Sequence, residues 1–544
     1  MDLPQVSRRT LLQGALGAGA LSALAACGGG SSSGKSSGNK TLVYADSDTP
    51  PSFDTDTGGA VDTGESIVAN CYAGDVFGFN KVSGPNGVQI ADMLAKGVKG
   101  GIAMGFAESV DVSDDLRTYT VHLRSGVKSA LGNTLTADDV VWSYQRSLAL
   151  KQTGAFMTNA MGITDPSQIT KLDASTVRFS LPSPSPIFLK VNAAKLYAGL
   201  FDSVAAKAHA TADDPWARNW LSQNTAGFGP YTVKSMQKGR FVNLEANPNY
   251  FKGAPAYSKV VWNAVPTSAN RMALLQGNDA DIAVKLTPPQ LKQAQAAKLK
   301  VTSYQANQIK SMQLNTKYGP LGDYRVRQAI AYAMPYEDIL SSVYLGTATA
   351  VRSPLPSSYP GYTDEYWSYS TNMDKARALL RDAGVSGFKL TLSYETTNYD
   401  DPLIAPIVKA ALGDLGITVE LEGLPQATFS EKLYSRKGQA YLVTNWPFVA
   451  DPGYALGVYW KSTAFNNVGA WSNAEFDKLV DQMLVEAADE RRYALAKTAQ
   501  EIYMREQPWI LLANPGWHVA HSAGVSGLTW YPNNGVRFED IKPA

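Results

Sequence analysis

Aromatic rings and a carboxylate stand together directly after an expected strand. The strand is expected over residues 439–443, and the segment Asn445–Tyr454 (NWPFVADPGY) follows it. Trp446 and Phe448 would offer flat apolar surfaces to a bound molecule, and Asp451 would offer a charge. The alternatives are core packing for Trp446 and a simple Asp-Pro turn for Asp451. These residue types make the segment a candidate for ligand binding, with both alternatives open.

A second candidate lies near the start of the folded chain. Phe53 and Asp54 stand in a loop rich in proline, aspartate, threonine and glycine, which follows a short expected strand over residues 41–45. Binding residues are often held on such loops. The alternative is a surface turn with a packed phenylalanine.

The sequence offers little for catalysis or for metal binding. It contains no GxSxG elbow, no HExxH motif, no phosphate loop and no Cys–His pair of the kind that nucleophilic enzymes use. Its histidines are few, and the closest two would point to opposite faces of one strand, so they could not share a metal ion. The four are His122, His209, His518 and His521. We therefore expect no enzyme activity, no cofactor and no protein-built metal site. An exported, lipid-anchored hydrolase is the alternative from a different class.

The N-terminus is typical of an export signal and a membrane anchor. Arg8 and Arg9 form a twin-arginine pattern, and the apolar run 14–26 is too short to span a bilayer of about 30 Å. The run ends in Leu-Ala-Ala before Cys27, the pattern at which a bacterial lipoprotein is cleaved and acylated on its new N-terminal cysteine. The Gly/Ser-rich residues 28–40 would form a flexible tether. The alternative is a plain secretory signal in which Cys27 is incidental.

Composition limits the possible partners. The chain has 544 residues, is 44% hydrophobic and carries a formal net charge of +1, so we expect a folded protein that does not bind nucleic acid. Its two cysteines exclude a disulfide framework. With Cys27 acylated, Cys71 would be a small buried residue.

Several local patterns predict the elements that position these residues. Residues 118–123 alternate as a half-buried strand, and Thr136 precedes Asp139 at the spacing of a capping box, so a helix should begin there. A strand, a helix and a second strand are expected between residues 389 and 421, which favours an α/β fold. Ser472 with Glu475 predicts another capping box, opening a helical stretch with one break before Pro508.

Five segments resemble one known family in collinear order. They cover nearly all of the chain after the tether and are similar to the family 5 extracellular solute-binding proteins, the peptide- and nickel-type binding components of ABC importers. The segments are DLRTYTVHLRSGVK with LTADDVVWSYQR (115–146), GFGPY (227–231), NLEANPNYFKGAPAYSKVV (243–261), RMALLQGNDADIA (271–283) and the pattern from Asn315 through Asp323 to Ala333.

The resemblance implies a two-lobe, periplasmic-binding-protein-like α/β fold with a hinge and an extra subdomain inserted in lobe I. The chain would cross between lobes near 305–312 and near Gln507. The implied divisions are a signal peptide (1–27), the tether (28–40), lobe I (41–72), its inserted subdomain (73–222), the second part of lobe I (223–308), lobe II (309–507) and a return to lobe I (508–544).

The resemblance also implies a function and its partners. A monomer, lipid-anchored to the outer face of the cytoplasmic membrane, would capture di- or oligopeptides in the cleft between its lobes and deliver them to the permease subunits of an ABC transporter. Segment Asn445–Tyr454 resembles the tryptophan-to-DP segment that lines this cleft in the family. An oligosaccharide, another polar solute or a metal chelate is the alternative ligand.

One departure from the family concerns the charge that would hold a peptide. Peptide-binding members usually carry a carboxylate three residues after the cleft tryptophan, where it pairs with the α-ammonium group, and this chain has Val449 there. A buried ammonium group without a partner is costly. Either another carboxylate takes the role, with Asp451, Glu395, Asp400 and Asp54 as candidates, or the ligand lacks a free amine.

Overall fold

The computed structural model describes residues 40–57, 62–72, 76–194, 197–305 and 307–544. The predicted signal residues Arg8, Arg9 and Cys27 lie outside these ranges. No helix within them is both long and apolar enough to cross a membrane.

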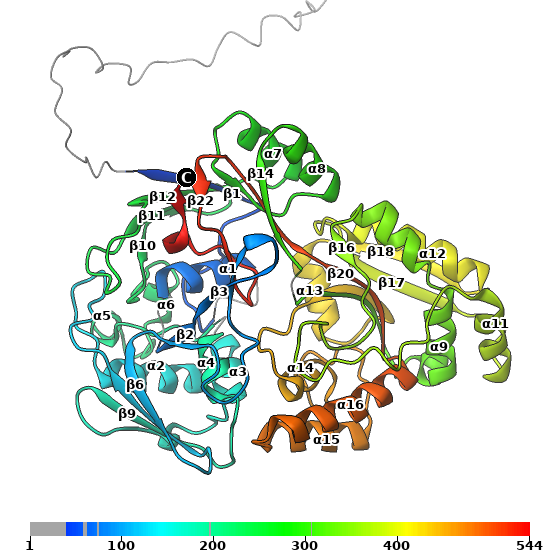
Figure 1. Cartoon of the computed structure of the whole chain (residues 1–544), viewed down its shortest axis with the longest axis horizontal. Helices are drawn as coiled ribbons and strands as arrows, with labels where there is room; N and C mark the ends of the chain where they lie inside the picture. Colours follow the sequence, from blue (N-terminus) through cyan, green and yellow to red (C-terminus); the bar gives the residue numbers. More distant parts are fainter. Residues whose placement is uncertain (1–39, 58–61, 73–75, 195–196, 306) are drawn as a thin grey trace, which may run out of the picture. The chain divides into compact units, whose positions relative to one another are not determined.

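One half of the fold is built on a seven-stranded sheet (Figure 1). Its central strand β1 pairs in parallel with β12 and with β13, and side chains of α7 and α8 pack in a separate apolar cluster with Ala283 and Ala520 of the sheet. In sheet order the strands are β10 (Tyr231–Gln237), β11 (Phe241–Ala246), β12 (Lys259–Ala264), β1 (Thr41–Asp46), β13 (Ile282–Ala283), β21 (Trp517–His521) and β14 (Lys300–Tyr304).

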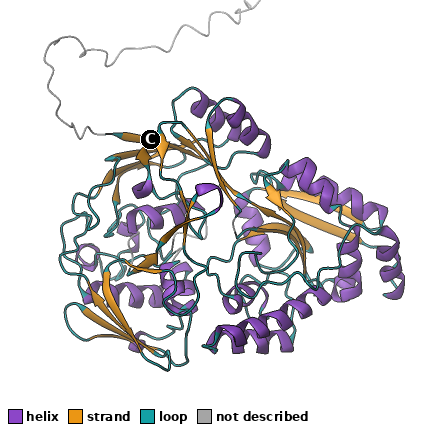
Figure 2. Cartoon of the chain, viewed as in Figure 1, coloured by secondary structure: helices purple, strands orange, loops and turns teal. Residues whose placement is uncertain are grey.

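The other half is built on a six-stranded sheet, and helices flank it (Figure 2). Every residue of β15 and β20 is buried, as expected for central strands covered on both faces. In sheet order the strands are β16 (Ala348–Thr349), β20 (Trp509–Pro515), β15 (Ile309–Leu314), β19 (Ala440–Asn445), β17 (Lys389–Glu395) and β18 (Thr418–Leu424).

The chain passes between these two sheets twice. It leaves the first sheet after β14 and enters the second at β15, and it returns between β20 and β21 at Gly516. The two passages are neighbours, because β14 pairs with β21 and β15 pairs with β20. The return lies beyond the predicted crossing near Gln507, since β20 still pairs with β15 after that point.

A smaller four-stranded sheet lies within residues 107–180. Its strands, in order, are β6 (Ala107–Val112), β7 (Thr118–Leu123), β9 (Thr176–Ser180) and β8 (Ile169–Lys171). The predicted bounds of β7 are confirmed, with its buried side chains at alternate positions. The predicted capping box is also confirmed, because the Thr136 backbone N–H donates to the Asp139 carboxylate at 2.8 Å where α2 begins.

Three shorter groups of strands complete the described sheets: β2 (Phe77–Phe79) with β5 (Ile102–Met104), β3 (Lys81–Ser83) and β4 (Gln89–Ala91) with β23 (Thr529–Trp530), and β22 (Val525–Ser526) with β24 (Lys542–Pro543).

The helices follow the predicted patterns with one correction. The cap of α15 is Asn473, whose side chain accepts a hydrogen bond from the Phe476 N–H, and not Ser472. Asparagine and serine cap helices about equally well, so adjacent candidates are hard to separate by sequence. The α-helices are α1 (Asp62–Ile67), α2 (Ala137–Leu150), α3 (Thr153–Ala160), α4 (Phe188–Ala193), α5 (Ser203–Lys207), α6 (Arg218–Leu221), α7 (Ser268–Gln276), α8 (Pro288–Ala296), α9 (Tyr324–Ala333), α10 (Tyr336–Asp338), α11 (Met373–Asp382), α12 (Asp401–Asp414), α13 (Gln426–Tyr434), α14 (Pro452–Trp460), α15 (Ala474–Val485) and α16 (Asp489–Glu506).

Candidate binding site

The predicted binding segment leaves the carboxyl end of β19 and runs into α14. Trp446 is half-buried, whereas Phe448 and Val449 are buried. The Phe448 and Tyr454 rings meet edge to face, with centroids 5.1 Å apart. Of the aromatic residues predicted in this segment, Trp446 therefore keeps the most surface for a ligand.

The loop after β19 is tied to the passage between the two sheets. Asn307 donates from its side-chain amide to the Pro447 carbonyl at 2.8 Å and to the Pro532 carbonyl at 3.0 Å. The Tyr359 hydroxyl also donates to the Pro447 carbonyl. These contacts fix the backbone on which Trp446 stands.

Asp451 is engaged by the protein itself. Its Oδ1 accepts a hydrogen bond from the Tyr454 N–H at 3.0 Å, which caps α14, and its Oδ2 forms an ion pair with Arg492 of α16. Both carboxylate oxygens thus have partners. In the structure Asp451 is thus the N-cap of α14 and the ion-pair partner of Arg492.

Asp54 also has a buried partner. Arg146 of α2 donates to Asp54 Oδ1 at 2.8 Å and to Asp54 Oδ2 at 2.7 Å, and it also contacts Asp56. Burial acts to lower the pKa of Arg146, but the two carboxylates outweigh it and raise that pKa. Phe53 is almost fully buried in the core. The loop 52–56 is therefore held by α2 through charge-assisted hydrogen bonds.

Asp400 belongs to a buried cluster at the start of α12. Lys310 of β15 donates to Asp400 Oδ1 at 2.8 Å and pairs with Asp401, and the Tyr344 hydroxyl donates to Asp400 Oδ2 at 2.5 Å. Burial raises the pKa of Asp401 to about 7, against the lowering effect of Lys310. Asp400, like Asp54 and Asp451, therefore already has a cation beside it.

Glu395 is the half-buried last residue of β17. Its Oε1 accepts a hydrogen bond from the Thr397 hydroxyl at 2.5 Å. The structure does not place it in contact with Trp446.

A buried carboxylate that the sequence did not single out lies on α1. Glu65 of α1 is 5% exposed and accepts a hydrogen bond from the Tyr197 hydroxyl at 2.7 Å. Burial raises the pKa of Tyr459 on α14, and the neighbouring Tyr434 and then Glu65 raise it further by smaller amounts. The signal in the sequence was weak: Glu65 is the only charged residue in the run 63–74.

Two polar groups of the segment have no hydrogen-bond partner within the described part of the chain. They are the buried amide nitrogen Nδ2 of Asn445 and the hydroxyl of Tyr454. Burial, followed by the nearby Tyr459 and Tyr359, raises the pKa of Tyr454 well above its usual value, so its hydroxyl stays neutral. A buried polar group normally needs a partner, and a ligand or water would supply one here.

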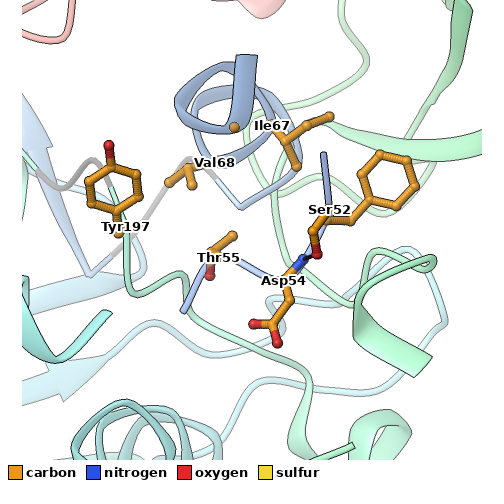
Figure 3. A pocket seen from close by; sticks show the side chains of 8 residues that line it. Ser52, Asp54, Thr55, Ile67, Val68 and Tyr197 are labelled. Atoms are coloured by element: carbon orange, nitrogen blue, oxygen red, sulfur yellow. Dashed lines mark hydrogen bonds between the residues drawn. The ribbon is translucent and has the colours of Figure 1, made fainter. Parts of the chain in front are cut away.

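One hollow borders the loop 52–55, and another lies beside α15 and α16. A cavity of about 10 Å³, large enough for one water molecule, is enclosed by the loop 52–55, by Ile67 and Val68, and by Tyr197 (Figure 3). A second, open hollow of about 890 Å³ lies between the turn Asp114–Leu116 and residues of α15 and α16. Its size is within the range of small-molecule sites.

The two histidines of β21 have separate hydrogen-bond partners. His518 contacts the Ser303 hydroxyl and the Thr347 carbonyl, whereas His521 contacts Thr302 and the Ser522 carbonyl. Among the described residues, no group of three potential metal ligands gathers in one place.

The matching family and two similar proteins are all solute-binding or peptide-binding proteins. Residues 101–467 match the family described as bacterial extracellular solute-binding proteins, family 5 Middle. The chain is 30% identical over 432 residues to the probable D,D-dipeptide-binding periplasmic protein DdpA of Escherichia coli (strain K12), an alignment that covers 78% of this chain and 82% of that protein. It is 28% identical over 472 residues to di/tripeptide-binding protein 2 of Pseudomonas aeruginosa (strain UCBPP-PA14), covering 80% and 85%.

A solved structure shows the same fold. The ABC transporter-associated periplasmic binding protein DppA from Helicobacter pylori, in complex with the peptide STSA, matches with a TM-score of 0.81 at 22% identity, over 92% of this chain and 98% of that one. The predicted α/β, two-lobe fold is thereby confirmed.

Proposed function

The chain belongs to the bacterial extracellular solute-binding proteins of family 5, the extracytoplasmic receptors of ABC importers, and from this we propose that its own ligands are di- or oligopeptides. The observation that carries the proposal is that two polar groups, at Asn445 and Tyr454, have no hydrogen-bond partner among the described residues and belong to the same segment as the half-buried Trp446. A peptide offers both backbone hydrogen bonds and side chains, so it can satisfy polar groups and cover an aromatic ring together. The names of the two relatives described above agree with this ligand class.

We further propose that the two large sheets form lobes that close around the ligand. Lobe I would comprise 41–72, the inserted subdomain 73–222, 223–308 and the C-terminal return, and lobe II would begin at 309. The hinge would lie where the chain passes from β14 to β15 and at Gly516, and we propose the last boundary at Gly516 instead of 508. A ligand favours the closed state only through contacts with both lobes at once.

The proposal includes the cellular setting. The protein would act as a monomeric receptor without enzyme activity, a cofactor or bound nucleic acid, and it would present the captured peptide to the permease subunits of its importer. Export through the twin-arginine signal and acylation of Cys27 would hold it on the outer face of the cytoplasmic membrane. Several acyl chains, each contributing about 0.8 kcal/mol per buried CH₂, would make that attachment stable.

Thermal unfolding with a mixed peptide library tests the ligand class and the absence of chemistry together. The full chain, extracted from membranes, should melt at a higher temperature with the library, because a ligand at a hundred times its dissociation constant stabilises the native state by about 2.7 kcal/mol. Mass spectrometry of the library afterwards should show every peptide intact. Cleaved peptides would favour the hydrolase alternative, and stabilisation by oligosaccharides alone would favour another solute.

A further inference from the structure

We propose that Asn307 positions the binding segment for the ligand by tying it, through one side-chain amide, to the other half of the fold. This inference rests on the proposed function and deepens it, because it assigns the coupling between ligand binding and closure of the two halves to one residue. Asn307 is a positioning residue: it acts through Pro447, the neighbour of Trp446, and not by touching the ligand.

Asn307 lies where the two halves of the fold are joined. The chain passes there from β14, in the half with the seven-stranded sheet, to β15, in the half with the six-stranded sheet. The side chain is 1% exposed. Hinge motion is absorbed by a few residues at such passages, so a buried side chain at this place can contact both halves at once.

The amide of Asn307 divides its hydrogen bonds between the two halves. A carboxamide carries two N–H donors, and Asn307 Nδ2 donates to the Pro447 carbonyl at 2.8 Å and to the Pro532 carbonyl at 3.0 Å. Pro447 belongs to the binding segment, and Pro532 belongs to the C-terminal loop 531–535. The Oδ1 of Asn307 accepts a longer hydrogen bond from Asn534 of that loop at 3.4 Å.

The C-terminal loop 531–535 is anchored to the seven-stranded sheet. Trp517 of β21 donates from its indole nitrogen to the Asn534 carbonyl at 2.9 Å. The ring of Trp530, directly before the loop, packs against Tyr304 of β14 with centroids 4.7 Å apart, and its indole N–H donates to Asn534 Oδ1 at 2.8 Å. The Pro532 carbonyl therefore reports the position of the seven-stranded half, and Asn307 transmits that position to Pro447.

The contact with Pro447 acts on the aromatic residue beside it. A residue that precedes proline is restricted to extended backbone conformations, so the backbone of Trp446 has little freedom once Pro447 is held. The Tyr359 hydroxyl donates to the same Pro447 carbonyl from within the six-stranded half. A segment held in its binding conformation loses less entropy when the ligand binds, which raises affinity.

Asn467 provides a matched control within one half of the fold. It is also fully buried, and its amide also donates to two carbonyls, those of Trp471 at 2.7 Å and Lys461 at 3.3 Å. All three residues belong to the loop 461–471. Alanine at either asparagine removes a buried amide with two carbonyl acceptors, but only at Asn307 do those acceptors belong to different halves.

Hydrogen exchange of the full chain without ligand, read by mass spectrometry, tests the link. Asn307→Ala should raise exchange by about tenfold both in residues 446–451 and in the C-terminal loop 531–535. Asn467→Ala should raise it in the loop 461–471 and leave those two segments as in the wild type. Equal melting temperatures of the two variants would show that the difference is local.

Calorimetric titration with the dipeptide Ala-Phe tests the consequence for binding. Asn307→Ala should weaken Ala-Phe by at least about tenfold, whereas Asn467→Ala should change the affinity by less than about twofold. Tyr359→Phe should also change it by less than about twofold, because it removes one donor to Pro447 and leaves both carbonyl contacts of Asn307.

A second substitution covers the case in which Asn307→Ala does not fold. Asn307→Ser keeps one hydroxyl donor, which can serve one carbonyl but not both. It should raise exchange in one of the two segments and weaken Ala-Phe by at least about threefold. A folded Asn307→Ser protein with the affinity and the exchange of the wild type would overturn the proposal.

The outcomes separate this inference from the proposed function. Unchanged exchange in either segment of Asn307→Ala, an equal rise in Asn467→Ala, or unchanged Ala-Phe affinity of Asn307→Ala would overturn the role of Asn307 and leave peptide binding standing. Equal weakening by Tyr359→Phe would assign the effect to anchoring within one half and also overturn the link. A wild type that binds neither Ala-Phe nor the peptide library would overturn the proposed function, and the exchange measurement would still decide the link because it needs no ligand.

Discussion

Arg492 of α16 forms a buried ion pair with Asp451, the residue that caps α14. Arg492 also contacts Asp489 at 3.4 Å, and Asp489 accepts a hydrogen bond from the Gly97 N–H at 3.3 Å. The pair therefore links the end of the binding segment to α16 and, through it, to a loop in the other half of the fold. Asp451 supports the position of the segment and leaves ligand contact to its neighbours.

Asp451→Asn should destabilise the protein strongly. Asparagine can still cap α14, but it leaves the buried Arg492 charge with only its longer contact to Asp489, and breaking one side of a buried pair costs up to about 3–5 kcal/mol. Urea unfolding should show a loss of that size. The control is Asp374→Asn, whose side chain is fully exposed in a surface pair with Arg377, and it should change the unfolding free energy by less than about 1 kcal/mol. A stable Asp451→Asn protein that has lost peptide affinity would instead make Asp451 a ligand contact.

Trp446→Ala should weaken peptide binding without unfolding the protein. The side chain is half-buried at the end of β19, so its removal takes away contact surface for the ligand and little core packing. We expect a loss of at least about tenfold in affinity, or about 1.4 kcal/mol, measured by calorimetry. Trp262→Ala is the contrasting variant, because Trp262 is fully buried in β12, and it should cost about 3–5 kcal/mol of stability. An unchanged dissociation constant for Trp446→Ala would assign Trp446 to the core.

Cys27→Ala should release the protein from the membrane. The prediction comes from the sequence pattern around Cys27, because an alanine at that position cannot be acylated. Cell fractionation should find the wild type with membranes and the variant in the soluble extracytoplasmic fraction. Attachment of the variant that still depends on acyl chains would contradict the prediction, and the variant should keep the peptide affinity of the wild type.

Local patterns predicted several of the helices and strands, and the binding segment stays a prediction. The bounds of β7, the cap of α2 and the strand before Trp446 all follow from neighbouring residues, and these are the features that the structure reproduces. The predicted cap of α15, Ser472, is one residue away from the observed cap, Asn473, and both residue types cap helices well.

The roles of the carboxylates could not be predicted in the same way. Asp54 pairs with Arg146, and Asp400 with Lys310, across roughly 90 residues of sequence in each case. Such partners are brought together by the tertiary fold, and no local spacing indicates them. Glu65 was missed for the same reason, since its partner, the Tyr197 hydroxyl, lies 132 residues away in the sequence.

Asp401→Asn should change how stability depends on pH. The pKa of Asp401 is raised from 3.8 to about 7 in the folded protein, chiefly by burial. A carboxyl group with a raised pKa holds its proton more tightly in the folded state, so it contributes stability at low pH that is lost as the pH rises from 3.8 to about 7. The unfolding free energy of the wild type, minus that of Asp401→Asn, should therefore fall across this window when both are measured by urea unfolding. A difference that stays constant, or that rises with pH, would mean that the charge of Lys310 outweighs burial and keeps Asp401 ionised.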